Sequence, residues 1–204
     1  RHKKQTGGAG QFGEVFLRLE PLPRGSGFQF ADEVKGGVIP SQFIPSVEKG
    51  VRSVLACGPL AGLPVEDVKI TVHDGKHHPV DSKDIAFQAA GRKAMLDALR
   101  AAGEAVLEPI VDIEVTTPEA NLGDITTDLI GRRGQVTGTE SLSQGLALIH
   151  GQVPLAELDG YAGRLKAITA GQGAFSMVLS HYHPAPQDVQ QKLAGAYKAV
   201  QEED

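Results

Sequence analysis

The sequence predicts an α+β protein made of two consecutive two-layer domains, each with helices packed on a sheet. Short stretches in which apolar and polar residues alternate, typical of half-buried strands, are interspersed with longer segments whose apolar residues recur every three or four positions, typical of amphipathic helices. This pattern starts again after a short junction at residues 103–108. We therefore expect domains at residues 1–106 and 107–204.

The first expected domain opens with a hairpin. Its tip is the glycine-rich stretch 6–13, because so many glycines in a short run oppose any regular element. A basic segment precedes this tip, and apolar and polar residues alternate from Glu14 to Glu20 as in a strand. In order, the later elements are a strand at 28–30, a helix ending at Leu55, a strand at 65–72, a second tip at 73–79, and a helix from its cap, Asp81 or Ser82, to about Ala102.

The second expected domain has four strands and two helices. Its elements are a strand at 110–118, a helix at 122–130, strands at 135–142 and 146–153, a helix at 154–168 and a strand at 174–182. This β-α-β-β-α-β order is the ferredoxin-like arrangement. Pro184 and Pro186 then precede a short amphipathic tail helix.

Charge limits the classes of function. The 204 residues carry a net charge of −5, which argues against broad nucleic-acid binding. The charge is uneven, since residues 1–106 have 14 Lys and Arg against 12 Asp and Glu, net +2, while residues 107–204 have 6 against 13, net −7. An RNA contact is therefore expected only locally, at a tip of the first domain.

Other features of the composition concern location. A single cysteine, Cys57, cannot form an intrachain disulfide, which fits the reducing cytoplasm that we expect. No apolar run is long enough to span a membrane, and no signal-peptide pattern opens the chain. Because residue 1 is an arginine in what reads as mid-strand, we expect a fragment of a longer protein.

The glycine-rich stretch also matches two nucleotide-binding patterns. Gly8-x-Gly10-x-x-Gly13-x-Val15 fits the protein-kinase loop, and its three glycines fit the dinucleotide fingerprint. The dinucleotide pattern needs a strand before the glycines and a helix after them, the reverse of the order here. The kinase pattern needs a strand lysine and the H-R-D and D-F-G motifs, which this sequence lacks. Neither interpretation fits.

Catalytic and metal-binding patterns are weak. His73, Asp74, His77 and His78 are the one dense group of metal-ligand types, so a metal hydrolase is the alternative from another class. However, adjacent histidines on a strand point to opposite faces. We expect no catalytic residue, no cofactor and no metal site in this chain. Arg132-Arg133 fits either a charge pair at a helix C-terminus or a phosphate contact to rRNA.

The positive signal is the pair of tips on one domain. Glycines allow close backbone approach, while lysine and histidine offer hydrogen bonds and charge. Such a surface suits RNA, whose backbone and minor groove are recognised by shape. The predicted RNA-contacting residues are Gly7, Gly8, Ala9, Gly10 and Gln11 in the first tip, and Lys76, His77 and His78 in the second.

Many blocks of the sequence, in order and over the whole chain, resemble bacterial translation elongation factor G, domains IV and V. The first block is the stretch from His2 to Gly13. The others are Gly36-Gly37-Val38-Ile39-Pro40, Gly58-Pro59-Leu60-Ala61-Gly62, Asp74-Gly75, His78-Pro79-Val80-Asp81-Ser82, Ala86-Phe87, Leu107-Glu108-Pro109-Ile110, Thr116-Thr117-Pro118-Glu119, Arg132-Arg133-Gly134-Gln135, Val153-Pro154-Leu155-Ala156-Glu157 and Gly160-Tyr161-Ala162.

The resemblance implies a β-α-β domain IV of the ribosomal-protein type, with a rare left-handed crossover, followed by a ferredoxin-like domain V. It implies a monomeric, tRNA-mimicking arm that promotes translocation of tRNA and mRNA. Its tips would contact the tRNA–mRNA duplex at the decoding centre, and domain V would dock near the large-subunit GTPase centre. GTP and Mg would bind in the missing N-terminal domain, so this chain would not be an enzyme although its parent would be a GTPase.

Two related functions stay open beside translocation. Ala9 stands where the family usually has arginine, and Lys76-His77 replaces a commoner Ser-Tyr pair. These departures allow a specialised second-copy factor, such as one for ribosome recycling. A ribosomal protection protein of the tetracycline-resistance type, built from similar domains, is the other alternative.

Overall fold

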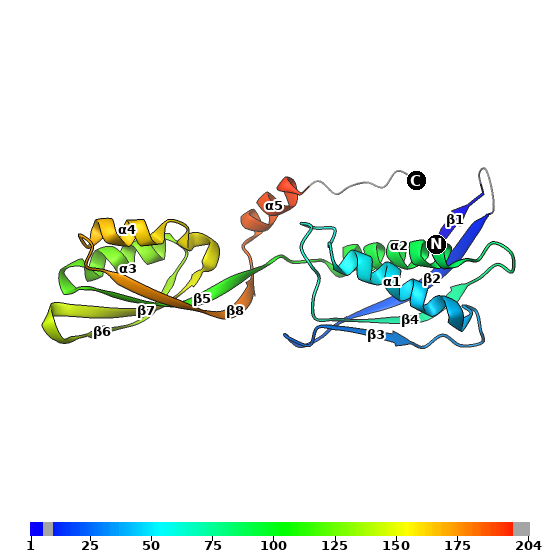
Figure 1. Ribbon diagram of the computed structural model, residues 1–204, viewed down its shortest axis with the longest axis horizontal. Helices are drawn as coiled ribbons and strands as arrows, with labels where there is room; N and C mark the ends of the chain where they lie inside the picture. The colour runs from blue at the N-terminus through cyan, green and yellow to red at the C-terminus, as the bar shows by residue number, and fades with distance from the viewer. Residues whose placement is uncertain (6–9, 198–204) are drawn as a thin grey trace. The chain divides into compact units, whose positions relative to one another are not determined.

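The computed structural model describes residues 1–5 and 10–197, which form two compact units. Unit 1 contains Arg1–Val106 together with the tail from Gln187, and unit 2 contains Leu107–Pro186. In each unit the helices lie on one face of a four-stranded sheet (Figure 1). The α+β class predicted from the sequence is confirmed.

Unit 1 is built on a sheet with the strand order β1-β2-β4-β3. The strands are β1 (His2–Lys4), β2 (Gln11–Pro21), β3 (Phe28–Asp32) and β4 (Val68–Lys76). β2 is antiparallel to both β1 and β4, whereas β3 and β4 are parallel. A short 3-10 turn, η1 (Ser41–Phe43), and helix α1 (Ile44–Leu55) connect the two parallel strands, which makes this part a β-α-β unit.

The core of unit 1 lies between the sheet and helices α1 and α2 (Asp84–Ala102). Alternate residues of β2 and β4, such as Val15 and Val72, are buried under the apolar stripe of α1. The two helices approach each other closely at Gly50, where a Cβ atom would overlap the backbone oxygen of Gln88. The helix pair therefore depends on a residue without a side chain at this contact.

Unit 2 has the ferredoxin-like order that the sequence predicts. Its elements are β5 (Leu107–Pro118), η2 (Glu119–Asn121), α3 (Leu122–Gly131), β6 (Gln135–Ser141), η3 (Ser143–Gly145), β7 (Leu146–Pro154), η4 (Leu155–Leu158), α4 (Tyr161–Ile168) and β8 (Ala174–Pro184). The sheet order is β6-β7-β5-β8, with every neighbouring pair antiparallel. α3 and α4 cover a core that includes Val111, Ile113, Val115, Ile149 and Tyr161.

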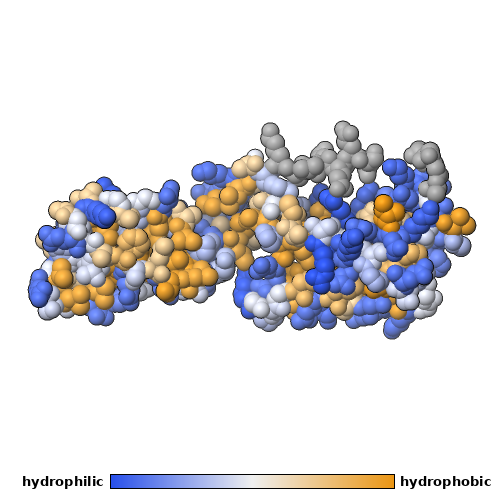
Figure 2. Space-filling view, in the orientation of Figure 1, coloured by the Kyte–Doolittle hydropathy of each residue, from blue (hydrophilic) through white to orange (hydrophobic). Residues whose placement is uncertain are grey.

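Strand β8 is an edge of this sheet, because β5 is its one partner among the described strands. Met177, Val178, Leu179 and Tyr182 on it are large apolar residues with more than two fifths of their surface exposed. Orange side chains gather over this part of unit 2 in the space-filling view (Figure 2). An apolar edge strand is a surface on which another chain or domain can pack.

Several element boundaries differ from the sequence predictions. β4 continues to Lys76, so the second tip, expected at 73–79, begins only after that residue. The helix expected at 154–168 is a 3-10 turn, η4, and a separate α4, because Asp159 and Gly160 leave the helical conformation between them. The strand expected from Val65 begins at Val68, after Asp67 adopts a positive φ of 59°. The helix expected to be capped by Asp81 or Ser82 begins at Asp84, with Lys83 at the cap position and no side-chain cap bond.

The tail helix α5 (Gln187–Ala196) groups with unit 1, although we assigned residues 187–204 to the second domain from the sequence. The contacts give the reason. Val106 N donates to Gln190 Oε1 at 3.0 Å, and Tyr197 Oη lies 3.2 Å from Cys57 Sγ. The tail thus returns to the unit that the chain left at residue 106.

The close contact of α1 with α2 predicts that alanine at Gly50 destabilises the protein, although alanine usually stabilises a helix relative to glycine. Gly50→Ala should destabilise the protein by about 1–3 kcal/mol, because the methyl group has no space between the two helix backbones. A helical glycine in open space should behave in the opposite way. Gly163→Ala in α4, where a Cβ would touch nothing within 4 Å, should stabilise by about 0.5–1 kcal/mol. Calorimetric unfolding of both variants checks this, and stabilisation by Gly50→Ala would contradict it.

Candidate nucleic-acid interface

The pairing of β2 with β4 brings the two predicted tips to the same end of unit 1. Glu14 pairs with Lys76, and Lys4 at the other side of the hairpin pairs with Gln11. Gly10 and Gln11 therefore lie next to the loop of residues 77–83 that follows β4. Gly7, Gly8 and Ala9 lie outside the described residues.

Two hydrogen bonds connect the hairpin directly to the loop of residues 77–83, and a third lies within that loop. Phe12 N donates to Asp81 O at 2.9 Å, and Ser82 Oγ donates to Phe12 O at 2.8 Å. His78 N in turn donates to Ser82 Oγ at 2.9 Å. Both backbone polar groups of Phe12 are thus bonded to the second tip, which ties the hairpin to the loop.

Gly10 allows this approach. A Cβ atom at Gly10 would lie 2.6 Å from Asp81 Oδ1 and 2.7 Å from Asp81 Cγ, closer than real side chains come. Any larger residue would have to displace the Asp81 side chain. Glycine at position 10 therefore lets the Asp81 side chain pack against the hairpin, and a larger residue there would move that carboxylate.

His78 is held in a defined orientation. Its Nδ1 accepts from the backbone N of Asp81 at 3.2 Å and of Val80 at 3.3 Å. Nδ1 also lies 3.4 Å from Asp81 Oδ2, and in the tautomer in which Nδ1 accepts the two backbone bonds the ring proton is on Nε2. The ring also makes an edge contact with Phe12, at 6.4 Å between centroids, and the side chain remains 51% exposed. His78 can therefore present a donor to a ligand.

The other predicted residues of the second tip lie differently. His77 Nδ1 is 3.1 Å from Val38 O, so its ring is turned toward the loop before α1. Lys76 is exposed at the end of β4. Gln11 is half-buried, and its Oε1 lies 2.9 Å from His2 Nε2 across the hairpin.

A shallow hollow of about 310 Å³ lies between the tips. Its lining is predominantly basic and polar, and consists of Arg1, Lys3, Gln5, Gln11, Phe12, Glu14, Lys76, His77, His78 and Asp81. Lysine, arginine and histidine donors around such a hollow suit phosphate oxygens. Sequence reasoning missed Arg1, Lys3, Phe12 and the linking residues Asp81 and Ser82. The sequence held one signal for Ser82. A serine that caps a helix is often followed three positions later by Glu or Gln, but position 85 is Ile, which argues against a capping role for Ser82.

The histidine group proposed as a metal site is spread over separate contacts. His73 lies beside Phe16, with the ring centroids 6.4 Å apart, while His77 and His78 have the partners given above. In the part of the chain that the structure describes, no three His, Cys, Asp or Glu side chains are grouped to hold a metal ion. The geometry offers nothing in support of the hydrolase alternative.

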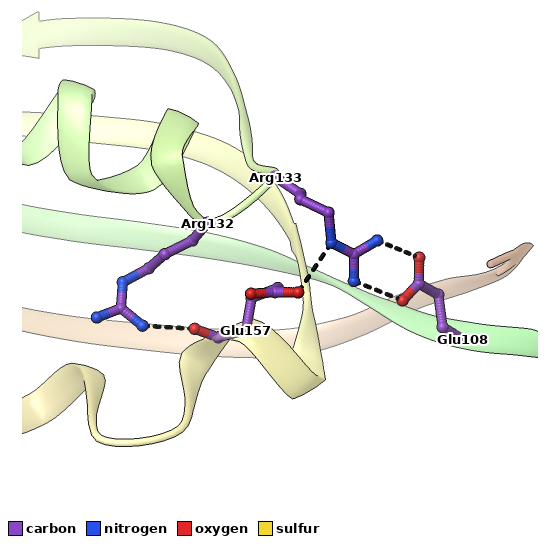
Figure 3. Close-up of polar contacts among 4 residues, drawn as sticks. All are labelled: Glu108, Arg132, Arg133 and Glu157. Atoms are coloured by element: carbon purple, nitrogen blue, oxygen red, sulfur yellow. Dashed lines mark hydrogen bonds and ion pairs between the residues drawn. The ribbon is translucent and has the colours of Figure 1, made fainter. Parts of the chain in front are cut away.

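Arg132 and Arg133 are engaged inside unit 2 (Figure 3). Arg133 Nη1 and Nη2 donate to the two carboxylate oxygens of Glu108 at 2.8 and 2.9 Å, and its Nε donates to Glu157 Oε1 at 2.8 Å. These hydrogen bonds, with Glu108 foremost, raise the pKa of Arg133. Arg133 therefore joins the end of α3 to β5 and to η4, a structural use of its charge.

Arg132 makes a second such connection. Its Nε donates to Asp128 Oδ2 at 2.9 Å, its Nη1 donates to Glu157 O at 2.5 Å, and its guanidinium lies 5.2 Å from the centre of the Tyr161 ring. Arg164 Nε donates to the other oxygen of Asp128 at 3.0 Å. Burial alone raises the pKa of Asp128, but the hydrogen bonds and charges of the two arginines outweigh it, so that this pKa is lowered.

The two-point bond of Arg133 predicts that lysine cannot replace it. Arg133→Lys keeps the charge but cannot reach both oxygens of Glu108, which is only 11% exposed, so unit 2 should lose about 1–3 kcal/mol. Arg18→Lys is the matched control, because the Arg18–Glu33 pair is 49% exposed on both sides and should contribute under about 1 kcal/mol. Equal effects of the two substitutions in urea unfolding would refute this reasoning.

The lowered pKa of Asp128 predicts an acid-sensitive contribution to stability. Its stabilisation is fully present above the unfolded pKa, about 3.9, and is lost as the pH falls through the lower folded value. Asp128→Asn should thus lower the free energy of unfolding by about 1.5–3 kcal/mol at pH 7. The difference in this free energy between the variant and the parent chain should become smaller below about pH 4. Unfolding measured from pH 2 to 7 checks this, and a gap that stays constant would contradict it.

Comparison with known proteins divides the chain near residue 104, as the structure does, although the second match continues into α5. The model of "Elongation factor G, domain IV" matches residues 1–103, and that of "Elongation factor G C-terminus" matches residues 105–193. Elongation factor G of Aquifex pyrophilus is 50% identical over 192 residues, which are 94% of this chain and 27% of that protein. An "Elongation factor G-like protein" of Thermotoga maritima is 46% identical over 193 residues, 95% of this chain and 28% of that protein.

A solved structure agrees with these relatives. A crystal structure of a Thermus thermophilus protein superposes with a TM-score of 0.77 at 40% identity, over 96% of this chain and 29% of that chain. The chain thus spans between a quarter and a third of the length of the relatives that it matches. None of the helices that the structure describes could cross a membrane. The chain belongs to the elongation factor G family, of which it carries domain IV and the C-terminal domain.

Proposed function

We propose that this chain is the ribosome-engaging arm of a translational GTPase that promotes the movement of tRNA and mRNA through the ribosome. The observation that carries the proposal is the juxtaposition of the two tips of unit 1, joined through Phe12. Membership of the elongation factor G family supports the same role. The arm would act in the cytoplasm as part of a monomeric factor.

The tips have the chemistry that RNA requires. The hollow between them is lined by arginine, lysine, histidine and glutamine side chains, which donate to phosphate and sugar oxygens. His78 would present a ring donor to the tRNA–mRNA duplex at the decoding centre. Because unit 1 is only weakly basic, recognition would depend on shape and on a few hydrogen bonds.

The chain contributes no chemistry of its own in this proposal. GTP and Mg would bind in a part of the parent outside this chain, and unit 2 would dock near the GTPase centre of the large ribosomal subunit. The tips would convert the energy of that hydrolysis into directional movement by occupying the position that tRNA vacates. We assign no ribosomal contact to Arg132 or Arg133, because both already bind carboxylates within unit 2.

Exchange of this chain into a complete factor tests the proposal. A chimera in which it replaces the matching part of Aquifex pyrophilus elongation factor G should support single-round mRNA translocation. Replacing Gln11, Lys76 and His78 together by alanine should slow that step by at least about tenfold, since several hydrogen bonds to charged groups are lost. Lys35→Ala with His73→Ala is the control, because both residues are exposed in unit 1 but do not line the hollow between the tips. An unchanged translocation rate in the tip variant would overturn the assignment.

A specialised factor is the second candidate. The similarity to the Thermotoga maritima "Elongation factor G-like protein" is nearly as high as that to the Aquifex factor. In that case the chimera should support ribosome splitting while translocation fails. The two assays on one chimera separate the candidates.

A further inference from the structure

We propose that Ser82 is a positioning residue whose hydroxyl holds residues 10–12 of the hairpin and His78 of the second tip in one fixed arrangement, so that Gln11 and His78 meet the same ligand. The inference extends the proposed function and rests on it for the identity of the ligand, an RNA duplex. The arrangement itself can be tested without the ribosome.

The Ser82 hydroxyl serves both tips at once. It donates to Phe12 O in β2 at 2.8 Å and accepts from His78 N at 2.9 Å. A hydroxyl can donate one bond and accept others, so a single oxygen joins the hairpin to the backbone of the second tip. With the neighbouring bond from Phe12 N to Asp81 O, both backbone polar groups of this one residue are bonded to residues 81–82.

These bonds reach the groups that face a ligand. Asp81 N donates to His78 Nδ1, which orients the ring, and the Asp81 carboxylate fills the space beside Gly10. The Phe12 ring lies against the edge of the His78 ring. Displacement of residues 81–82 would therefore shift both residues 10–12 and His78.

The alternative role of Ser82, as the cap of α2, is not used. Serine immediately before a helix ordinarily bonds a backbone N–H of the first turn. Here α2 begins at Asp84, Lys83 stands at the cap position, and the helix has no side-chain cap bond. The hydroxyl is directed to the tips instead, which separates its role from stabilisation of the helix.

Amide hydrogen exchange in the whole chain tests the positioning directly. Ser82→Ala leaves the acceptor of Phe12 N, the backbone oxygen of Asp81, chemically intact. If Ser82 positions the tips, exchange at Phe12 N should nevertheless rise about tenfold, the factor expected from the loss of a hydrogen bond. Ser82→Thr, which keeps a hydroxyl, should restore slow exchange, and amides in the core should not change.

Ser46→Ala is the matched control. Ser46 Oγ donates to Asp84 Oδ1 at 2.7 Å, so this variant loses a serine hydrogen bond near the start of α2, whereas Ser82→Ala loses the two bonds at the tips. It should leave exchange at Phe12 N within about twofold of the parent chain. The proposal is overturned if Ser82→Ala leaves exchange at Phe12 N unchanged, or if Ser46→Ala raises it equally.

A second measurement tests the consequence for ligand binding. In the chimera described above, Gln11→Ala and His78→Ala should weaken ribosome binding non-additively, because one ligand meets both residues in a fixed arrangement. In the Ser82→Ala background the two effects should become additive. If the effects of Gln11→Ala and His78→Ala on ribosome binding are additive without the Ser82 substitution, the inference that both residues meet one ligand is wrong. A chimera that does not bind ribosomes would sink the proposed function, while exchange at Phe12 N would still decide the role of Ser82.

Discussion

The antiparallel pairing of β2 with β4 is the contact on which the arrangement of unit 1 depends. It aligns Val15 and Val72 toward the helices and so forms the core. The same register places Lys76 opposite Glu14 and thereby sets the second tip beside the hairpin. A slip of one residue would turn the apolar side chains outward and move His78 away from the hairpin. The register of β2 against β4 therefore determines both the stability of the domain and the geometry of its tips.

Charged residues are used differently in the two units. In unit 2 the two arginines after α3 are bound by Glu108, Asp128 and Glu157, so their charge stabilises the junction of α3, β5 and η4. In unit 1 Lys76 and His78 remain exposed at the tips. Basic residues thus serve the fold in one unit and are exposed to a ligand in the other. The difference follows from the carboxylates that surround them, which motif matching does not reveal.

Sequence periodicity was sufficient for most of the fold, since the strands and helices of both units have clear apolar faces. Boundaries were less predictable because they depend on local backbone geometry, such as the positive φ of Asp67 before β4 and the turn at Asp159 between η4 and α4. The candidate site was predictable in part, because glycines, lysine and histidines marked the two tips. The residues that join the tips, Phe12, Asp81 and Ser82, act mainly through backbone groups and one hydroxyl. Their role arises from a contact between segments about 70 positions apart, which no local pattern encodes.

The negative net charge of the chain bears on how its tips could recognise RNA. Long-range attraction to phosphates is weak for a protein of net charge −5, so steering would contribute little. Affinity then has to come from short-range hydrogen bonds and from fit, and both depend on the groups being held in place before the ligand arrives. The bonds at Phe12, His78 and Ser82 supply that preorganisation. An arm of this kind would gain selectivity for one shape of RNA, because it would lack the charge to bind every RNA.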